Sequence, residues 1–241
     1  MSIFAQVFGY LLGLIYGLVN DYGIAIIIFT LFTKLLLMPF TIKQMKSSKA
    51  MAAIQPKMKE IQEKYKDNKE KQNQMLVELY KEHKYNPMSG CLPLLIQFPI
   101  IIGLFTALRE PGTYVFVNNP ELTLLATQDT FLWIKNLSTP DLMSNIFTTG
   151  PAWLLALPGI MPIMSSVLTY FQMSSQNAST QTSGNNAMNN QMKIMQIMFP
   201  VMILFWGTSL SAGLILYWTV GSVFQIVQQY VMKTPAKGET K

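Results

Sequence analysis

Lys34 lies in the middle of the apolar run IAIIIFTLFTKLLLMPF, and no acidic residue stands within two helical turns of it. A lysine at the centre of a membrane-spanning helix costs about 2.5 to 3.5 kcal/mol, so such a residue faces protein, water or a substrate and not lipid. Thr30 precedes Lys34 by four residues and Thr33 is adjacent to it, which gives the helix one hydrophilic face. We therefore predict that Lys34 attracts anionic groups of a substrate.

Other apolar segments carry neutral polar side chains at helical spacing. They are Gln97, then Ser165, Ser166, Thr169 and Gln172, and finally Trp218, Ser222 and Gln225. Any one of them has a structural explanation, because hydrogen bonds between packed membrane helices contribute about 0.6 kcal/mol each. Together with Lys34 they predict a hydrophilic groove, closed on the outer side and open to the inside, that carries polar parts of another chain part-way into the membrane.

The same segments exclude most chemistry. They contain no His, Asp or Glu, which argues against metal sites, general acid–base pairs and carboxylate proton relays. No phosphate-binding or hydrolase motif is present. Cys91 is the single cysteine and has no partner for a disulfide or a metal site. The sequence predicts a protein that is not an enzyme and that has no catalytic residue, metal or cofactor.

The composition is that of an integral membrane protein of the all-α class. Half of the 241 residues are hydrophobic and 12% are charged. Five apolar stretches, near 22–42, 92–108, 152–171, 194–213 and 214–232, are long enough to span a bilayer. Residues 3–19 carry Gly9, Gly13 and Gly17 at four-residue spacing, which suits a sixth span or a helix lying on the membrane, and we favour the interfacial helix.

Charge predicts the orientation. Eleven of the eighteen basic residues and six of the twelve acidic ones lie between Lys43 and Lys84, so this segment has a net charge of +5 and belongs on the cytoplasmic side. Residues 109–150 have a net charge of −2 and belong outside. The N-terminus is then extracellular and the C-terminus cytoplasmic. Apolar stripes within the basic segment, from Ile54 to Tyr65 and from Met75 to Tyr80, predict an antiparallel cytoplasmic helical hairpin.

These patterns divide the chain into nine segments. In order they are an N-terminal interfacial helix (1–20), the first transmembrane helix (21–45), the charged cytoplasmic hairpin (46–87), the second transmembrane helix (88–109), an extracellular region (110–150), the third transmembrane helix (151–173), a mobile polar cytoplasmic loop (174–192), a hairpin of the fourth and fifth transmembrane helices (193–232) and a short basic cytoplasmic tail (233–241).

Several ordered stretches resemble one family. YGIAIIIFTLFTKLLLMPFTIKQMKSSKAM, IQPKMKEIQEKYKDNKEKQNQ, NPMSGCLPLLIQFPIIIGLF, FLWIKNLSTPD and LYWTVGSVFQIVQQ are similar to the YidC/Oxa membrane protein insertases, over Tyr22 to Met232. The resemblance implies a five-helix core with a groove open to cytoplasm and lipid, and a hairpin that captures clients. It also implies a Gram-positive-type member without the large periplasmic domain. Lys34 stands where the family has arginine, which keeps the charge but loses the planar fork, and Trp218 matches a groove-lining position.

The function that follows is an energy-independent insertase and chaperone of the bacterial plasma membrane. Its partners would be small or nascent membrane proteins and the lipid bilayer, with or without the Sec translocase. The short tail does not favour ribosome docking, and for the basic hairpin we favour a solvated face near anionic headgroups over contact with ribosomal RNA. The alternatives are a small-solute transporter or channel with Lys34 as its anion site, although inverted repeats are not apparent, and a purely structural assembly factor of a translocon.

Overall fold

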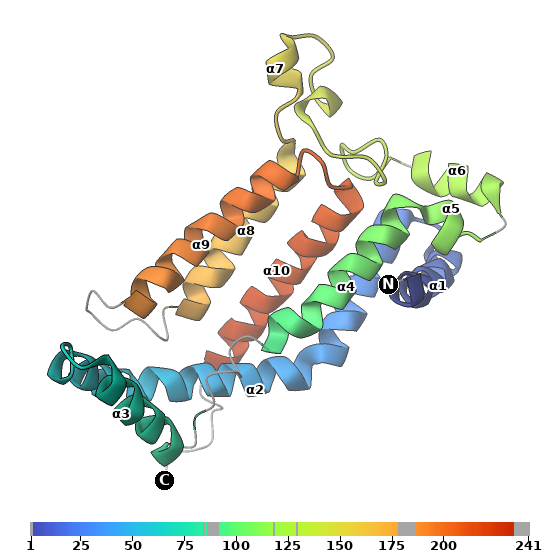
Figure 1. Cartoon of the computed structure of the whole chain (residues 1–241). Helices are drawn as coiled ribbons and strands as arrows, with labels where there is room; N and C mark the ends of the chain where they lie inside the picture. Colours follow the sequence, from blue (N-terminus) through green and yellow to red (C-terminus); the bar gives the residue numbers. More distant parts are fainter. Residues whose placement is uncertain are drawn as a thin grey trace.

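A computed structural model describes residues 2–83, 85, 92–117, 119–128, 130–177 and 187–233, and most of these lie in helices, with no strand among them (Figure 1). The helices, in chain order, are α1 (Ser2–Val19), α2 (Tyr22–Lys64), α3 (Lys69–Glu82), α4 (Leu92–Arg109), α5 (Pro111–Tyr114), α6 (Pro120–Gln128), η2 (Met143–Asn145), α7 (Ala152–Leu155), α8 (Ile160–Asn177), α9 (Ala187–Trp206) and α10 (Ala212–Lys233). The predicted all-α fold is confirmed.

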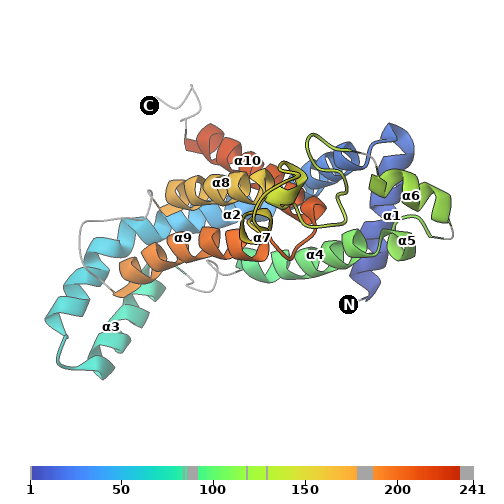
Figure 2. The ribbon, with the colours of Figure 1, turned by 90° about the horizontal axis from the view of Figure 1, so that it is seen from above.

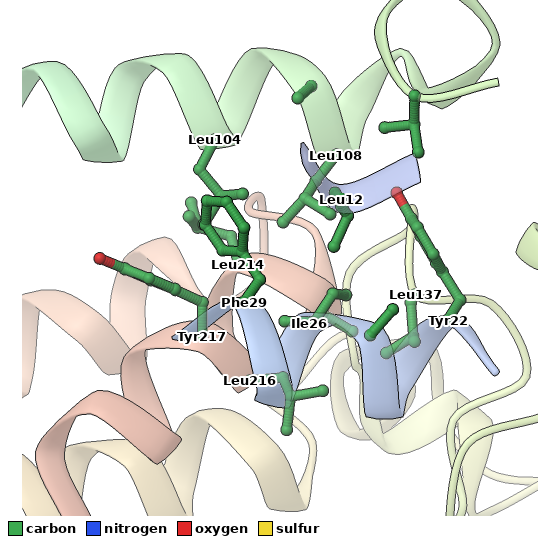
Figure 3. Close-up of a cluster of buried hydrophobic side chains, with 14 of the residues drawn as sticks. Leu12, Tyr22, Ile26, Phe29, Leu104, Leu108, Leu137, Leu214, Leu216 and Tyr217 are labelled. Atoms are coloured by element: carbon green, nitrogen blue, oxygen red, sulfur yellow. The ribbon is translucent and has the colours of Figure 1, made fainter. Parts of the chain in front are cut away.

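The main core lies where α1, α2, α4 and α10 meet (Figure 3). Apolar residues recur at three and four positions along each helix, so each presents one apolar face to the others. The fully or almost fully buried side chains include Leu12, Tyr22, Ile26, Phe29, Leu104, Leu108, Leu214 and Leu216. This core holds the N-terminal part of α2 against α10, the two helices that carry Lys34 and its neighbours.

The first helix, α1, lies across the direction of the other long helices. Figure 1 shows it nearly end-on, and Figure 2 shows its length crossing that of α4. The change of direction occurs at Asn20, whose left-handed backbone (φ 52°) ends α1, and at Asp21, whose carboxylate accepts a hydrogen bond from Ile24 N and begins α2. A Cβ on Gly9 would lie 2.2 Å from the carbonyl oxygen of Tyr114, so only glycine permits this close crossing.

The second helix, α2, is longer than expected. It runs without interruption from Tyr22 to Lys64, so it does not end near residue 45, where the first predicted transmembrane helix ends and the predicted hairpin begins. It contains Pro39 and Pro56, which remove backbone hydrogen bonds and bend a helix. Figure 1 shows the resulting change of direction between its part beside α4 and α10 and its part beside α3.

The second half of α2 and the antiparallel helix α3 form a charged helix pair with a small apolar seam. Ile54, Met58 and Leu79 are buried in it. The partly exposed residues packed against them are Met51, Ile61, Leu76, Tyr80 and Tyr85. These residues belong to the apolar stripes of the sequence, apart from Met51 and Tyr85.

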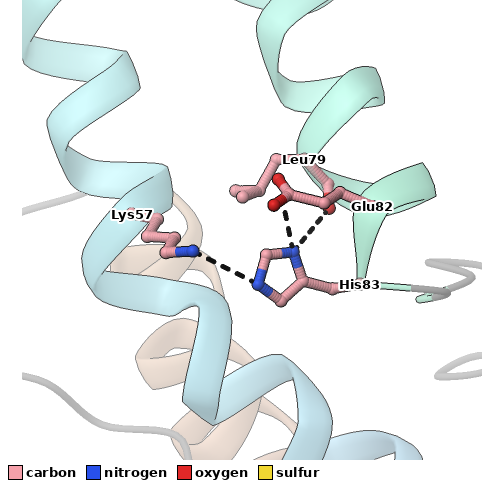
Figure 4. Close-up of polar contacts among 4 residues, drawn as sticks. All are labelled: Lys57, Leu79, Glu82 and His83. Atoms are coloured by element: carbon pink, nitrogen blue, oxygen red, sulfur yellow. Dashed lines mark hydrogen bonds and ion pairs between the residues drawn. The ribbon is translucent and has the colours of Figure 1, made fainter.

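Polar contacts join the far end of this pair (Figure 4). His83 Nδ1 donates a hydrogen bond to the carbonyl oxygen of Leu79 at 3.1 Å, and Nε2 accepts one from Lys57 Nζ at 3.4 Å. The carboxylate of Glu82 is 3.9 Å from Nδ1. His83 thus contributes to helix packing.

The helix expected over 151–173 begins only at Ile160. The reason is that Pro158 and Gly159 are held by the segment around Asp141: Pro158 forms a β-bridge with Leu142, and Gly159 N donates to the carbonyl oxygen of Asp141. The Asp141 carboxylate also accepts a hydrogen bond from Met161 N at 2.9 Å. The carboxylate caps the first turn of α8 and prevents the helix from extending backwards. Apolar residues before Ile160 lie instead in α7 and its flanking turns.

The remaining boundaries also shift. The polar segment expected over 174–192 is helical as far as Asn177 and again from Ala187, and residues 178–186, the middle of the predicted mobile loop, lie outside the described residues. The turn between the last two helices is at 207–211, whereas the apolar stretches predicted that the fourth helix continues to about residue 213. Residues 84, 86–91 and 234–241 also lie outside the description, with most of the predicted tail.

Among the described residues, α2 is the one helix whose length and composition are sufficient for it to cross a membrane. Shorter apolar segments cover Ile3–Val19, Gln97–Arg109 and Lys193–Gly207. The count of five spans therefore stays a prediction.

Candidate functional site

The side chain of Lys34 projects from α2 against α10. It is only 8% exposed, and its ammonium nitrogen lies 6.0 Å from the ring centroid of Tyr217. No described residue forms an ion pair or a hydrogen bond with this nitrogen. A ring face attracts a cation by about 0.5 to 2 kcal/mol, which does not neutralise a buried charge. The ammonium group therefore retains unused hydrogen-bonding capacity.

Gly221 makes room for this cation. A Cβ at Gly221 would lie 2.8 Å from Lys34 Cε and 3.2 Å from Nζ, so a side chain there would displace the end of the lysine. Tyr217, one turn earlier on α10, accepts a hydrogen bond through its hydroxyl from Gln97 Nε2 at 3.0 Å. Gln97 comes from α4, so the surroundings of Lys34 join three helices. The predicted site residues Lys34 and Gln97 are brought to the same tyrosine.

Thr30 and Thr33 are buried, but their hydroxyls donate within α2. Thr30 Oγ1 donates to the carbonyl oxygen of Ile26 at 2.6 Å, and Thr33 Oγ1 donates to that of Thr30 at 2.8 Å. Each hydroxyl keeps acceptor capacity only. They supply a polar lining beside Lys34, not free donors.

Two of the four predicted polar residues of α8, Thr169 and Gln172, lie along its seam with α10. Thr169 Oγ1 is 3.4 Å from Ser222 Oγ, and Gln172 Nε2 donates to Gln225 Oε1. Hydrogen bonds between packed helices are the structural explanation that applies to each of these side chains considered singly. Ser222 follows Gly221 directly, so the seam begins next to the lysine.

The other three predicted site residues differ in their surroundings. Ser166 Oγ donates to the carbonyl oxygen of Pro200 in α9 at 2.8 Å. Ser165 is fully buried, and its hydroxyl has no partner among the described residues. Trp218 packs on Phe199 of α9, with ring centroids 5.4 Å apart. It therefore lies toward α9 and not beside Lys34.

Sequence reasoning missed three residues of α10 that bear on α2. Besides Tyr217 and Gly221 there is Gln228, whose side chain donates to Thr41 Oγ1 at 2.8 Å. These three residues follow one another at four and seven positions, so they share one helix face. This spacing in the sequence could have indicated that the three residues share a face. Only the tertiary structure shows that this face contacts α2 and that Gly221 lies against Lys34.

The chain matches a family model over most of its length. The model is described as the 60Kd inner membrane protein, and the match extends over residues 14–239. It includes α2, α4, α8, α9 and α10 and therefore Lys34 and all its neighbours.

Similar proteins have consistent names. A membrane protein insertase YidC of Chlorobaculum tepidum is 39% identical over 227 residues, which are 92% of this chain and 34% of that protein. A membrane protein insertase YidC 2 of Listeria innocua is 37% identical over 224 residues, 91% of this chain and 67% of that protein. The chain thus spans about a third of the first relative and about two thirds of the second.

A solved structure has the same fold. The crystal structure titled as an active YidC insertase with the first transmembrane domain resolved has a TM-score of 0.63 and 30% sequence identity, and the match covers 95% of this chain and 46% of the other. The extent of the family match and the identity to relatives agree with this likeness in fold. The chain therefore belongs to the family of the 60Kd inner membrane protein, the YidC/Oxa membrane protein insertases, and is a membrane protein with a transmembrane helical fold.

Proposed function

We propose that this chain is an energy-independent insertase and chaperone that receives the polar tails of small membrane proteins in a groove at Lys34. The observation that carries the proposal is the ammonium group of Lys34, which is largely buried and has neither an anionic nor a hydrogen-bonding partner among the described residues. Such a group is stable only where water or an anion of another molecule reaches it. An acidic client tail supplies that anion.

The polar seam between α8 and α10 extends this surface. Thr169, Ser222, Gln172 and Gln225 bond to one another in the structure, and their hydroxyl and amide groups can exchange these bonds for bonds to water or to a client backbone. The apolar client helix then leaves sideways into lipid, and hydrophobic transfer drives this step. The membrane potential adds about 2.3 kcal/mol per charge per 100 mV.

The membrane placement belongs to the same proposal. The helices α2, α4, α8, α9 and α10 supply the five spans, with the N-terminus outside and the C-terminus in the cytoplasm. The charged helix pair lies on the cytoplasmic side, where the +5 charge of residues 43–84 favours it. The crosswise helix α1, with apolar residues such as Tyr10 and Leu18 exposed, suits a helix lying in the outer interface. The Sec translocase is a further proposed partner.

Reconstitution with matched clients tests the electrostatic step. An ammonium and a carboxylate about 6 Å apart attract by about 3 kcal/mol at an effective dielectric constant of about 20, and screening reduces this value. We therefore expect Lys34→Ala to slow insertion of an acidic-tailed client about tenfold or more, and Lys34→Arg to retain it. The same client with its tail carboxylates changed to amides should differ little between wild type and Lys34→Ala.

The control removes one positive charge elsewhere. Lys193 is exposed on α9, and Lys193→Ala should leave insertion of both clients unchanged. Equal insertion of the acidic client by wild type and Lys34→Ala would overturn the electrostatic step. Leakage of small anions from the same liposomes would favour the transporter over the insertase.

Gly221→Ala perturbs the same site without changing its charge. The added methyl group would lie 2.8 Å from Lys34 Cε, so the ammonium must move away from α10. We expect slower insertion of the acidic-tailed client and near-normal insertion of the neutral-tailed one, measured in the same liposomes. A uniform loss for both clients would show damage to the helix packing instead of displacement of the charge.

A further inference from the structure

The segment before α8 carries large apolar side chains that lie neither in a long helix nor in the core. We call residues 142–158 the α7 loop. Trp153 is 69% exposed and Phe147 48%, and Ile146 and Leu157 are also exposed. No charged residue occurs from Leu142 to Met192. A loop that faces water is ordinarily polar, and a group of exposed apolar side chains marks a surface that something covers.

The base of the α7 loop is firmly closed. Met143 N donates to the carbonyl oxygen of Leu157 at 3.0 Å, and Leu142 and Pro158 form a bridge beside it. The neighbouring Asp141 is fully buried and accepts hydrogen bonds from Trp133 Nε1, Asn145 Nδ2 and Met161 N. The loop therefore presents its apolar side chains from a fixed support.

The apolar surface of the loop continues into α8. Ile160 and Ile163, in the first turn of α8, are each 41% exposed, and Val167 is exposed one turn further on. Figure 1 shows α7 beyond the ends of α8 and α9, at the end of the bundle where α5 and α6 also lie. In both views α7 and α1 are well apart.

We propose that the α7 loop is a second membrane anchor, which lies in the outer-leaflet interface and places Trp153 and Phe147 among the lipid headgroups and the upper acyl chains. Tryptophan is enriched at this depth because its ring is largely apolar while its N–H meets water or headgroups. The absence of charge fits lipid better than an aqueous protein partner, and the continuity with the exposed face of α8 places lipid beside the loop. The inference rests on the membrane placement proposed above.

The anchor would act on the groove through α8. Asp141 ties the loop to the first turn of α8, so holding the loop at one depth also holds the outer end of α8. The helix α1 packs against α2 and α4, on the other wall of the site. Two separate anchors would thus hold the two walls at fixed depths while a client passes.

Spin-label accessibility tests this arrangement in vesicles of phosphatidylethanolamine and phosphatidylglycerol. In a Cys91→Ala background, a nitroxide is attached to Trp153→Cys or, separately, to Phe147→Cys, and its collisions with oxygen and with a water-soluble nickel chelate are compared. We expect both labels to collide with oxygen severalfold more often than with the nickel chelate. Lys135→Cys, an exposed charged position of the same region, should favour the nickel chelate, and Val201→Cys, on the exposed apolar face of α9, should favour oxygen.

The controls separate two kinds of failure. Labels at 153 and 147 that are as open to nickel as the label at 135, with the label at 201 in lipid, would overturn the anchor while leaving the membrane placement intact. A label at 201 that is open to nickel would overturn the membrane placement and the anchor with it. Far-UV circular dichroism of each labelled protein confirms that the helices remain folded.

Discussion

Replacing Asp141 by alanine should destabilise the end of the bundle at which α8 begins. Its carboxylate is fully buried and accepts three hydrogen bonds, from Trp133 Nε1 at 3.2 Å, Asn145 Nδ2 at 3.1 Å and Met161 N at 2.9 Å. Met161 N belongs to the first turn of α8, where the helix dipole also favours a negative charge. One side chain therefore connects the preceding loop, the α7 loop and α8.

The expected magnitude follows from these contacts. A hydrogen bond to a charged group contributes about 1.5 to 3 kcal/mol, so three of them set a generous upper limit. Removing a buried carboxylate also recovers part of its desolvation cost, which amounts to several kcal/mol. We expect a net loss of about 3 kcal/mol for Asp141→Ala and a smaller loss for Asp141→Asn, which keeps one acceptor oxygen. For a chain of this size, that loss lowers the melting temperature by about 6 to 12 °C.

Two measurements check this value. Circular dichroism in detergent follows the melting temperature, and hydrogen exchange reports the amide of Met161, which loses its acceptor. A melting temperature within about 2 °C of wild type, together with unchanged exchange at Met161, would refute the reasoning.

Gly159→Ala provides the matched variant. A Cβ there would lie 2.5 Å from the carboxylate carbon and from Oδ2 of Asp141, so overpacking should cost about 1 to 3 kcal/mol. When Asp141 is already alanine, the obstacle is gone, and Gly159→Ala should cost little further stability. Additive losses in the double variant would show that the carboxylate and Gly159 do not share this space.

Two other predictions concern the ends of the molecule. Gly9→Ala should loosen α1, because its Cβ would lie 2.2 Å from the carbonyl oxygen of Tyr114. The control Gly17→Ala meets nothing within 4 Å and should be neutral or stabilising. Limited proteolysis of α1 distinguishes the two variants, and equal sensitivity to the protease would contradict the close crossing of α1 over Tyr114. In the charged helix pair, burial raises the pKa of the Tyr80 and Tyr85 hydroxyls, so the folded pair favours their neutral forms. The pair should keep its stability below about pH 10, the ordinary tyrosine value, and lose it as pH rises further, while Tyr→Phe at both positions abolishes the loss, as measured by hydrogen exchange of α3.

Much of the architecture was predictable because it depends on local pattern. Apolar runs and apolar periodicity are properties of short segments, and they predict helices without knowledge of their neighbours. The all-α fold and the family are confirmed. The boundaries were less predictable, because composition cannot distinguish apolar residues of a long helix from those of the α7 loop.

At the candidate site, what the sequence determines differs clearly from what only the tertiary structure determines. An isolated lysine in an apolar segment is visible in the sequence, because its cost depends on the medium around the segment. Its neighbours depend on contacts between distant parts of the chain: Gln97 reaches Tyr217 across 120 positions, and Gly221 meets Lys34 from another helix. Single-sequence periodicity assigns a residue to a face of its own helix but does not say which helix that face meets. The packing of the apolar surfaces of all helices decides which faces meet. It therefore also decides the surroundings of Lys34 and the burial of the Asp141 carboxylate.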